Sequence, residues 1–182
     1  MKTSDSDPIR VDFLPGEALG LQGRIGMTIS PGKKLPGLAG LWRRHLEKDL
    51  QRLREHYGAD LLVSLLEPNE FEKLGTPDLL ARARAYGMET AWLPTPDGSV
   101  PDSINAFREL IERILDSARQ GQTVIIHCRG GLGRTGLVAA SCLVALGHAP
   151  SQAVQVVRRV RPGSVENRKQ EEYVRAFSLG RL

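Results

Sequence analysis

Cysteine and aromatic residues are scarce in this sequence, and long apolar runs are missing. The 182 residues include two cysteines, Cys128 and Cys142, and 5% are aromatic. Two cysteines build no disulfide framework, so a hydrophobic core must hold the fold, and we expect a reducing, cytoplasmic setting. No apolar run reaches the roughly 18 residues of a membrane span, and residues 1–8 lack the apolar stretch of a signal peptide. We therefore expect no membrane span.

The charge balance is mildly basic. Lysine and arginine total 25 against 21 aspartate and glutamate, which gives a net charge of +4. Such a surface suits anionic ligands. No basic surface interleaved with aromatic residues is visible, so we expect no nucleic-acid partner. His45, His56 and His148 lack the spacing of metal ligands, and we expect neither a metal nor a cofactor.

The length and composition fit one globular domain. A chain of 182 residues lies within the range of a single domain. Its 41% hydrophobic residues can build a core, and its 25% charged residues argue against general disorder. We predict that residues 1–8 are disordered and that residues 9–182 form a single domain.

The hydrophobic pattern alternates between strand-like and helix-like segments. Continuous apolar runs such as 61–66 predict buried strands, and apolar stripes at steps of three and four, as in 42–57, predict helices. The predicted strands are 9–13, 24–29, 61–66, 89–93 and 124–127. The predicted helices are 42–57, 76–87, 104–118, 135–145, 150–160 and 164–177, with Thr76 and Ser164 as caps. This alternation predicts an α/β fold, with a central, mainly parallel sheet flanked by helices.

The most informative segment is 127–136, His-Cys-Arg-Gly-Gly-Leu-Gly-Arg-Thr-Gly, which follows the apolar run 124–126. Five residues separate Cys128 from Arg134, which is enough chain to loop around a tetrahedral anion. The glycines permit unusual φ angles and keep side chains out of the loop. The N-terminus of the next helix adds a partial positive charge. The predicted anion-binding residues are Arg129, Gly130, Gly131, Leu132, Gly133 and Arg134.

Three side chains of this loop have predicted chemical roles. Helix N-termini and nearby cations favour the thiolate form of a cysteine, which makes Cys128 a nucleophile aimed at phosphorus. Arg134 offers two parallel N–H groups to two phosphoryl oxygens, a geometry that lysine lacks. The hydroxyl of Thr135 is placed to donate to the sulfur and to stabilise it as a leaving group.

The segment resembles the signature of cysteine-dependent protein phosphatases, His-Cys-x5-Arg-Ser/Thr. Over roughly residues 40–175 the chain is similar to the dual-specificity group, and it most resembles the cyclin-dependent kinase-associated phosphatases, which carry a Cys-x-Gly-Gly-Leu-Gly-Arg loop. The resemblance implies a protein tyrosine phosphatase-like fold and a phosphorylated protein or peptide substrate. It also implies hydrolysis through a phosphocysteine on Cys128, without a cofactor, with His127 ordering the loop.

A general acid is needed to protonate the leaving oxygen, and a movable loop should carry it. Segment 93–102 holds three prolines, one glycine and two aspartates. Asp97 lies 31 positions before Cys128, which matches the acid loop of the resembled family, so Asp97 is the predicted acid. Asp102 or Ser103 is expected to cap the following helix. Asp97 as an ordinary turn residue, or an exchange of roles with Asp102, remain alternatives.

A positioned water is needed for the second chemical step. The resemblance points to a glutamine or asparagine near the C-terminus, and Gln170, in a Gln-x-x-Tyr pattern, is the candidate. The family's earlier glutamine falls at or near Glu166, which is a departure. An exposed polar helix face is the alternative for this stretch.

Other interpretations remain open at this point. A phosphoinositide or inositol-phosphate phosphatase would use the same site, with Arg129 as its basic loop residue. A non-catalytic phosphate-binding module and a sulfur-transfer or arsenate-reducing enzyme are further alternatives. Cys142 is expected in the core, with a disulfide to Cys128 as the alternative. Lys33 and Lys34 lie in a predicted solvated loop, 30–37, although they could instead reach the substrate.

Overall fold

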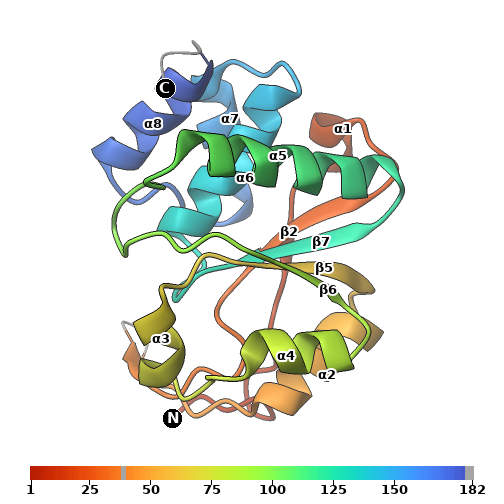
Figure 1. Cartoon of the computed structure of the whole chain (residues 1–182), viewed down its shortest axis with the longest axis vertical. Coiled ribbons are helices and arrows are strands. Elements are labelled where there is room, and N and C mark those ends of the chain that lie inside the picture. The colour runs from red at the N-terminus through yellow and green to blue at the C-terminus, as the bar shows by residue number, and fades with distance from the viewer. Residues whose placement is uncertain (38–39, 179–182) are drawn as a thin grey trace.

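The computed structural model describes residues 1–37 and 40–178. A five-stranded sheet runs through the centre, with helices on both faces (Figure 1). In spatial order its strands are β1 (Asp12–Phe13), β2 (Arg24–Thr28), β7 (Thr123–His127), β5 (Ala59–Ser64) and β6 (Glu89–Trp92). Strand β1 is antiparallel to β2, and the other pairs are parallel. The predicted α/β fold with a mainly parallel sheet is confirmed.

The helices divide between the two faces of the sheet (Figure 1). One face carries α5 (Ile104–Arg119), α6 (Gly133–Ala145), α7 (Pro150–Val160), α8 (Arg168–Ser178) and the short α1 (Gly16–Leu19). The other carries α2 (Leu46–Glu55), α3 (Pro68–Lys73) and α4 (Leu79–Ala85), near the ribbon of β3 (Pro36–Gly37) and β4 (Gly40–Leu41). None of the helices in the described ranges is long and apolar enough to cross a bilayer.

Strands β5 and β7 supply core residues to both faces. Successive side chains of a strand point to opposite faces of the sheet. Leu61 and Val63 therefore join the cluster under α5 and α6, while Leu62 and Ile125 join the cluster under α2 and α4. This explains the continuous apolar runs in the sequence. It also places the end of β7, which leads into the predicted anion loop, in the middle of the sheet.

Helix α2 begins later than the sequence pattern predicts. The predicted helix 42–57 begins at Leu46, and Trp42 lies outside it. The backbone N–H of Trp42 donates to Leu35, and that of Arg44 donates to Lys33. Residues 42–44 therefore pair with the loop after β2 instead of forming a first helical turn. The predicted strand 9–13 is likewise shortened, to Asp12–Phe13.

The prediction of a helix over residues 76–87 was wrong in part. The predicted helix 76–87 begins at Leu79, and the Thr76 hydroxyl forms no hydrogen bond within the described ranges. Helix α3 was not predicted. It begins with Pro68, and a capping box between Glu67 and Glu70 satisfies the backbone N–H groups at its N-terminus. These two glutamates are a helix signal that is present in the sequence.

The predicted cap of α5 is confirmed, and the predicted cap of α8 is wrong. The Ser103 side chain accepts from the N–H of Ala106 at 3.2 Å, as expected. Ser164 does not cap α8, because it is buried against Gly136 of α6. Asn167 caps that helix instead, with its side-chain oxygen 3.0 Å from the nitrogen of Gln170.

The first eight residues have defined contacts, although the composition predicts disorder for them. Lys2 forms a parallel bridge with Trp42, and its backbone pairs with Leu41 and Arg43. The carbonyl of Asp7 accepts from Arg44 Nη1 at 2.7 Å. This segment therefore lies against the loop that leads into α2.

A buried ion pair anchors the start of α2. Arg44 and Asp49 are each 1% exposed, and two hydrogen bonds of 2.7 and 2.8 Å join them. Asp49 also accepts from the N–H of Gly32 at 2.9 Å, and Gly32 has a φ of 72° that favours glycine. The pair therefore fixes the turn after β2.

We expect Asp49→Ala to lower the free energy of unfolding by about 3–5 kcal/mol, because it leaves the Arg44 charge buried without its partner. Asp5→Ala is the control, since Asp5 is 74% exposed in its pair with Lys48 and should cost at most about 1 kcal/mol. Urea unfolding measures both. Equal losses in the two variants would contradict the importance of the buried pair.

Candidate active site

The predicted anion loop lies at the carboxyl end of β7 and runs into α6. Cys128 is 3% exposed, and its Sγ accepts from the N–H of Gly131 at 3.2 Å. Helix α6 begins at Gly133, and no side chain caps it. Uncapped N–H groups at a helix start favour an anion there. The structure therefore places the sulfur against the backbone donors of its own loop.

Two of the loop glycines are required by geometry. Gly131 has a φ of 67°, and a Cβ there would collide with the carbonyl oxygen of Thr28 on β2. A Cβ on Gly133 would collide with the carboxylate of Glu166. Gly130 has neither a positive φ nor a close neighbour. Its predicted conformational role is therefore not seen, and the close packing depends on Gly131 and Gly133.

Arg134 is buried and joins several segments of the chain. Its guanidinium forms a double hydrogen bond with Glu70 of α3, including Nη2 to Oε1 at 2.9 Å. It also donates to the carbonyls of Leu65 and Thr95, at 3.3 and 2.9 Å, and to the Asp97 carboxylate at 2.9 Å. Burial alone would lower the pKa of Arg134, but the bond to Glu70 and the nearby Cys128 raise it. The arginine therefore stays charged.

Glu70 is the functional residue that the sequence reasoning missed. The buried charge of Arg134 needs an opposing charge, and Glu70 supplies it from within the chain. Burial alone would raise the pKa of Glu70, but the hydrogen bonds from Arg134 and from the Glu67 backbone lower it below its ordinary value. An ionised Glu70 therefore fixes the orientation of the guanidinium.

Asp97 lies across the mouth of the loop. Its two carboxylate oxygens contact Arg134 at 2.9 Å and Arg129 at 3.1 Å, and its side chain remains 43% exposed. Asp102 is exposed, next to the cap residue Ser103. The structure thus brings Asp97, and not Asp102, to the cysteine loop. Arg129 faces Asp97 across the same opening.

Three buried polar atoms around the loop have no hydrogen-bond partner within the described ranges: Nε of Arg134, Oγ1 of Thr135 and Nε2 of His127. Buried polar atoms are normally hydrogen-bonded, so such a cluster marks a functional site. The hydrogen bond predicted from Thr135 to the sulfur is not formed. The other ring nitrogen of His127, Nδ1, lies 3.3 Å from the carbonyl of Cys128, and burial lowers the pKa of His127 to about 4.

Gln170 is buried beside the loop. Its Oε1 accepts from the N–H of Glu166 at 3.0 Å, and a Cβ on Gly133 would lie 2.8 Å from its Nε2. It is therefore not part of an exposed polar face. Glu166 is exposed, with its carboxylate against Gly133. Val165 precedes it at a φ of 53°, a rare angle for a β-branched residue, so this turn is strained.

The two cysteines differ in their surroundings. Both are free in the structure, so the alternative of a disulfide between them is not realised. Cys142 is fully buried among the apolar residues of α6, and burial raises the pKa of its thiol. It therefore belongs to the core, as expected.

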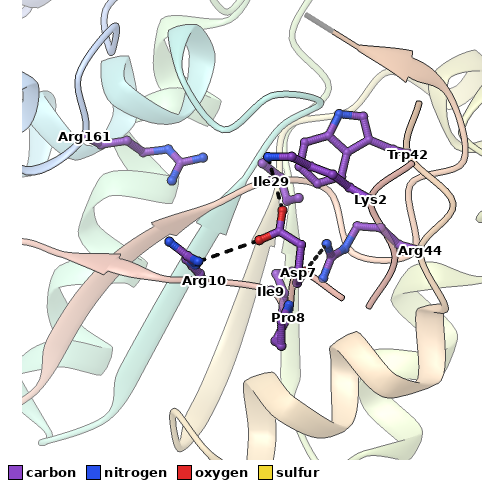
Figure 2. Close-up of a pocket in the computed structure, with 9 residues that line it drawn as sticks. All are labelled: Lys2, Asp7, Pro8, Ile9, Arg10, Ile29, Trp42, Arg44 and Arg161. Atoms are coloured by element: carbon purple, nitrogen blue, oxygen red, sulfur yellow. Dashed lines mark hydrogen bonds and ion pairs between the residues drawn. The ribbon is translucent and has the colours of Figure 1, made fainter. Parts of the chain in front are cut away.

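A separate basic pocket of about 190 Å³ lies between the N-terminal segment 2–10, Trp42, Arg44 and Arg161 (Figure 2). Its cations are already ion-paired: Lys2 and Arg10 with Asp7, Arg44 with Asp49, and Arg161 with Asp12. Arg161 also donates to the carbonyls of Gly131 and Gly130, at 2.6 and 3.2 Å. Arg161 therefore joins one wall of this pocket to the backbone of the cysteine loop.

A cysteine at the floor of a backbone nest, with an arginine and an aspartate above it, defines the class of cysteine-dependent phosphatases. Solved structures agree: the chain is similar to kinase associated phosphatase carrying a serine at its catalytic cysteine (TM-score 0.86, 28% identity, 95% of this chain and 96% of that one). It is also similar to Tk-PTP in its active form (TM-score 0.73, 28% identity, 93% and 96%).

Sequence comparisons narrow the class further. The family model for cyclin-dependent kinase inhibitor 3 (CDKN3) matches residues 2–155. Cyclin-dependent kinase inhibitor 3 of Rattus norvegicus is 32% identical over 176 residues, and that of Homo sapiens is 30% identical over 176 residues; each comparison covers 95% of this chain and 80% of the relative. The chain belongs to the cyclin-dependent kinase inhibitor 3 family and is a cysteine-dependent dual-specificity protein phosphatase.

We expect Glu70→Gln to lower kcat/KM by about 100-fold, because the guanidinium loses the charged partner that orients it. Glu72→Gln, on the exposed side of the same helix, is the control and should stay within about twofold. Steady-state kinetics on an aryl phosphate compares the two. Equal activity of the variants would show that Glu70 has no part in the site.

The buried His127 should make stability depend on pH. Its pKa is about 4 when folded and about 6.5 when unfolded, so the unfolded state binds more protons between these values. We expect the unfolding free energy to fall on acidification from pH 6.5 to 4, by on the order of 3 kcal/mol from this group. His127→Asn, which does not titrate, should remove that part. An identical pH dependence in the variant would contradict the assignment.

Proposed function

We propose that Cys128 is the nucleophile, Asp97 the general acid and Arg134 the phosphoryl-binding arginine in the hydrolysis of phosphorylated protein or peptide substrates. The observation that carries this proposal is the arrangement of Sγ against its own loop, 3.2 Å from the N–H of Gly131, with Arg134 and Asp97 in mutual contact above it. In the first step Sγ attacks phosphorus, and Asp97 protonates the leaving oxygen. A phosphocysteine results.

The contacts of Asp97 suggest how the acid is released. In the structure its carboxylate accepts from Nη2 of Arg134, while Nε, the other nitrogen of the edge that would bind two phosphoryl oxygens, has no partner within the described ranges. A bound phosphoryl group would compete for that edge and free Asp97 to take a proton and face the leaving oxygen. In the second step, water attacks the phosphocysteine while Asp97 accepts its proton. Gln170, buried beside Gly133, is the candidate that orients this water.

The remaining loop residues would hold the phosphoryl oxygens. The backbone N–H groups of residues 129–134 would stabilise the charge that develops in the transition state. Thr135, buried in the first turn of α6, would donate to the sulfur as it leaves, and His127 would support the loop through the Cys128 carbonyl. Both cysteines are free, and the proposed thiol chemistry requires a reducing compartment such as the cytoplasm.

A phosphoprotein is favoured over a phosphoinositide as substrate. Phosphoinositide phosphatases often have a second basic residue in this loop besides one such as Arg129, and this chain has Gly131 and Leu132 there. The family relationship also favours a protein substrate, since a similar solved structure is a kinase associated phosphatase.

These assignments are tested by measuring phosphate release from a matched set of substrates. The set contains phosphotyrosine, phosphothreonine and phosphoserine peptides and a soluble phosphatidylinositol trisphosphate. We expect peptide turnover that Cys128→Ser abolishes. Asp97→Asn should slow aryl phosphates with poor leaving groups by about 10²–10⁴-fold and those with good leaving groups less. Turnover of the lipid alone would overturn the substrate class. Equal slowing across leaving groups would move the acid to another residue, with Asp102→Asn tested next.

A further inference from the structure

Lys33 is a buried cation that the proposed chemistry leaves unused. Its side chain is 6% exposed, although the loop that carries it was predicted to be solvated. Its Nζ lies 3.5 Å from the carbonyl oxygen of Arg129 in the cysteine loop and 5.6 Å from the centre of the Trp42 ring. No carboxylate of the described ranges forms an ion pair with it, whereas the neighbouring Lys34 is exposed and contacts the carbonyl of Gly75.

The fold holds this lysine in place from both sides. The N–H of Gly32 donates to Asp49, the carbonyl of Lys33 accepts from the N–H of Arg44 at 3.0 Å, and the N–H of Lys34 donates to Leu74. A Cβ on Gly32 would lie 2.8 Å from that of Leu46, so the turn has little freedom. The Arg44–Asp49 pair therefore directs Lys33 to the rim of the cysteine loop.

The charges around Lys33 are those of the active site. Burial and the positive charge of Arg129 lower the pKa of Lys33, while Cys128 and Asp97 oppose that change. Arg44 and Asp49, which pack against the same turn, neutralise each other. Burying a cation without a partner is unfavourable unless negative charge is nearby. The nearest acidic groups that oppose the effect of burial on Lys33 are Cys128 and Asp97, and a substrate phosphoryl group would add negative charge on the same side.

We propose that Lys33 is a positioning residue of the phosphate site. Its ammonium group holds the Arg129 carbonyl in place. Its charge adds to the positive charge of Arg129 and Arg134, which attracts the substrate phosphoryl group. The inference rests on the proposed function. Lys33 acts through the loop and its field and touches no reacting atom. A lysine in this role also makes the site sensitive to alkaline pH. Because the pKa of Lys33 is lowered from its ordinary value of 10.5, the side chain loses its charge earlier than an exposed lysine as the pH rises.

The test compares Lys33→Met, Lys33→Arg and the control Lys34→Met on para-nitrophenyl phosphate, whose good leaving group depends little on the general acid. We expect Lys33→Met to lower kcat/KM by about 10- to 100-fold, mainly through a higher KM, and Lys34→Met to stay within about twofold. Wild-type kcat/KM should fall at alkaline pH. Lys33→Arg should move that fall to higher pH, because guanidinium does not titrate there.

Each result decides the question. Lys33→Met kinetics equal to those of Lys34→Met, or an alkaline fall that is the same in wild type and Lys33→Arg, would overturn the inference. If thermal unfolding shows that Lys33→Met does not fold, the alkaline profile of Lys33→Arg alone decides. A wild-type protein with no turnover of aryl phosphate or phosphopeptide would refute the proposed function itself, whereas normal turnover with unaffected Lys33 variants refutes only the role of Lys33.

Discussion

The ion pair between Arg134 and Glu70 is the interaction on which the site depends. Arg134 comes from the first turn of α6, and Glu70 comes from α3 on the opposite face of the sheet. The same guanidinium binds the carbonyls after β5 and β6 and the Asp97 carboxylate. A single buried side chain, that of Arg134, thus connects the cysteine loop with the segment that carries Thr95 and Asp97 and with the helices on both faces of the sheet. Because the pair is buried and doubly hydrogen-bonded, it orients the arginine before any substrate binds.

Charge balance is the second constraint. Arg134, Arg129 and Lys33 face Glu70, Asp97 and the Cys128 sulfur within one small region. The carboxylates hold the cations in place. Asp97, which contacts both Arg129 and Arg134, is partly exposed, so another anion could replace it. The permanent partner, Glu70, is buried. Under the proposed function, this division between a fixed and a replaceable carboxylate would let a rigid site bind a phosphoryl group.

Much of the fold and the centre of the site could be predicted from local sequence. Apolar periodicity identified four of the five sheet strands nearly to their ends and helices α5, α6 and α7, because burial imposes those periods directly. The cysteine loop was visible because its chemistry lies in consecutive residues. Glu70 and Lys33 could not be predicted, since each acts through a partner 64 or 96 positions away. Only the capping box of Glu67 and Glu70 could have indicated α3. Trp42 was assigned to a helix from its spacing, but its backbone pairs with Leu35 instead.

A covalent bond between Cys128 and phosphorus can be detected by trapping the phosphocysteine. Asp97→Ala protein mixed with para-nitrophenyl phosphate and quenched in acid within milliseconds can be digested and analysed by mass spectrometry. We expect one phosphoryl group on the peptide that contains Cys128, and none in the Cys128→Ser protein. A phosphoryl group on another residue, or release of one equivalent of nitrophenol with no phosphorylated peptide, would contradict it.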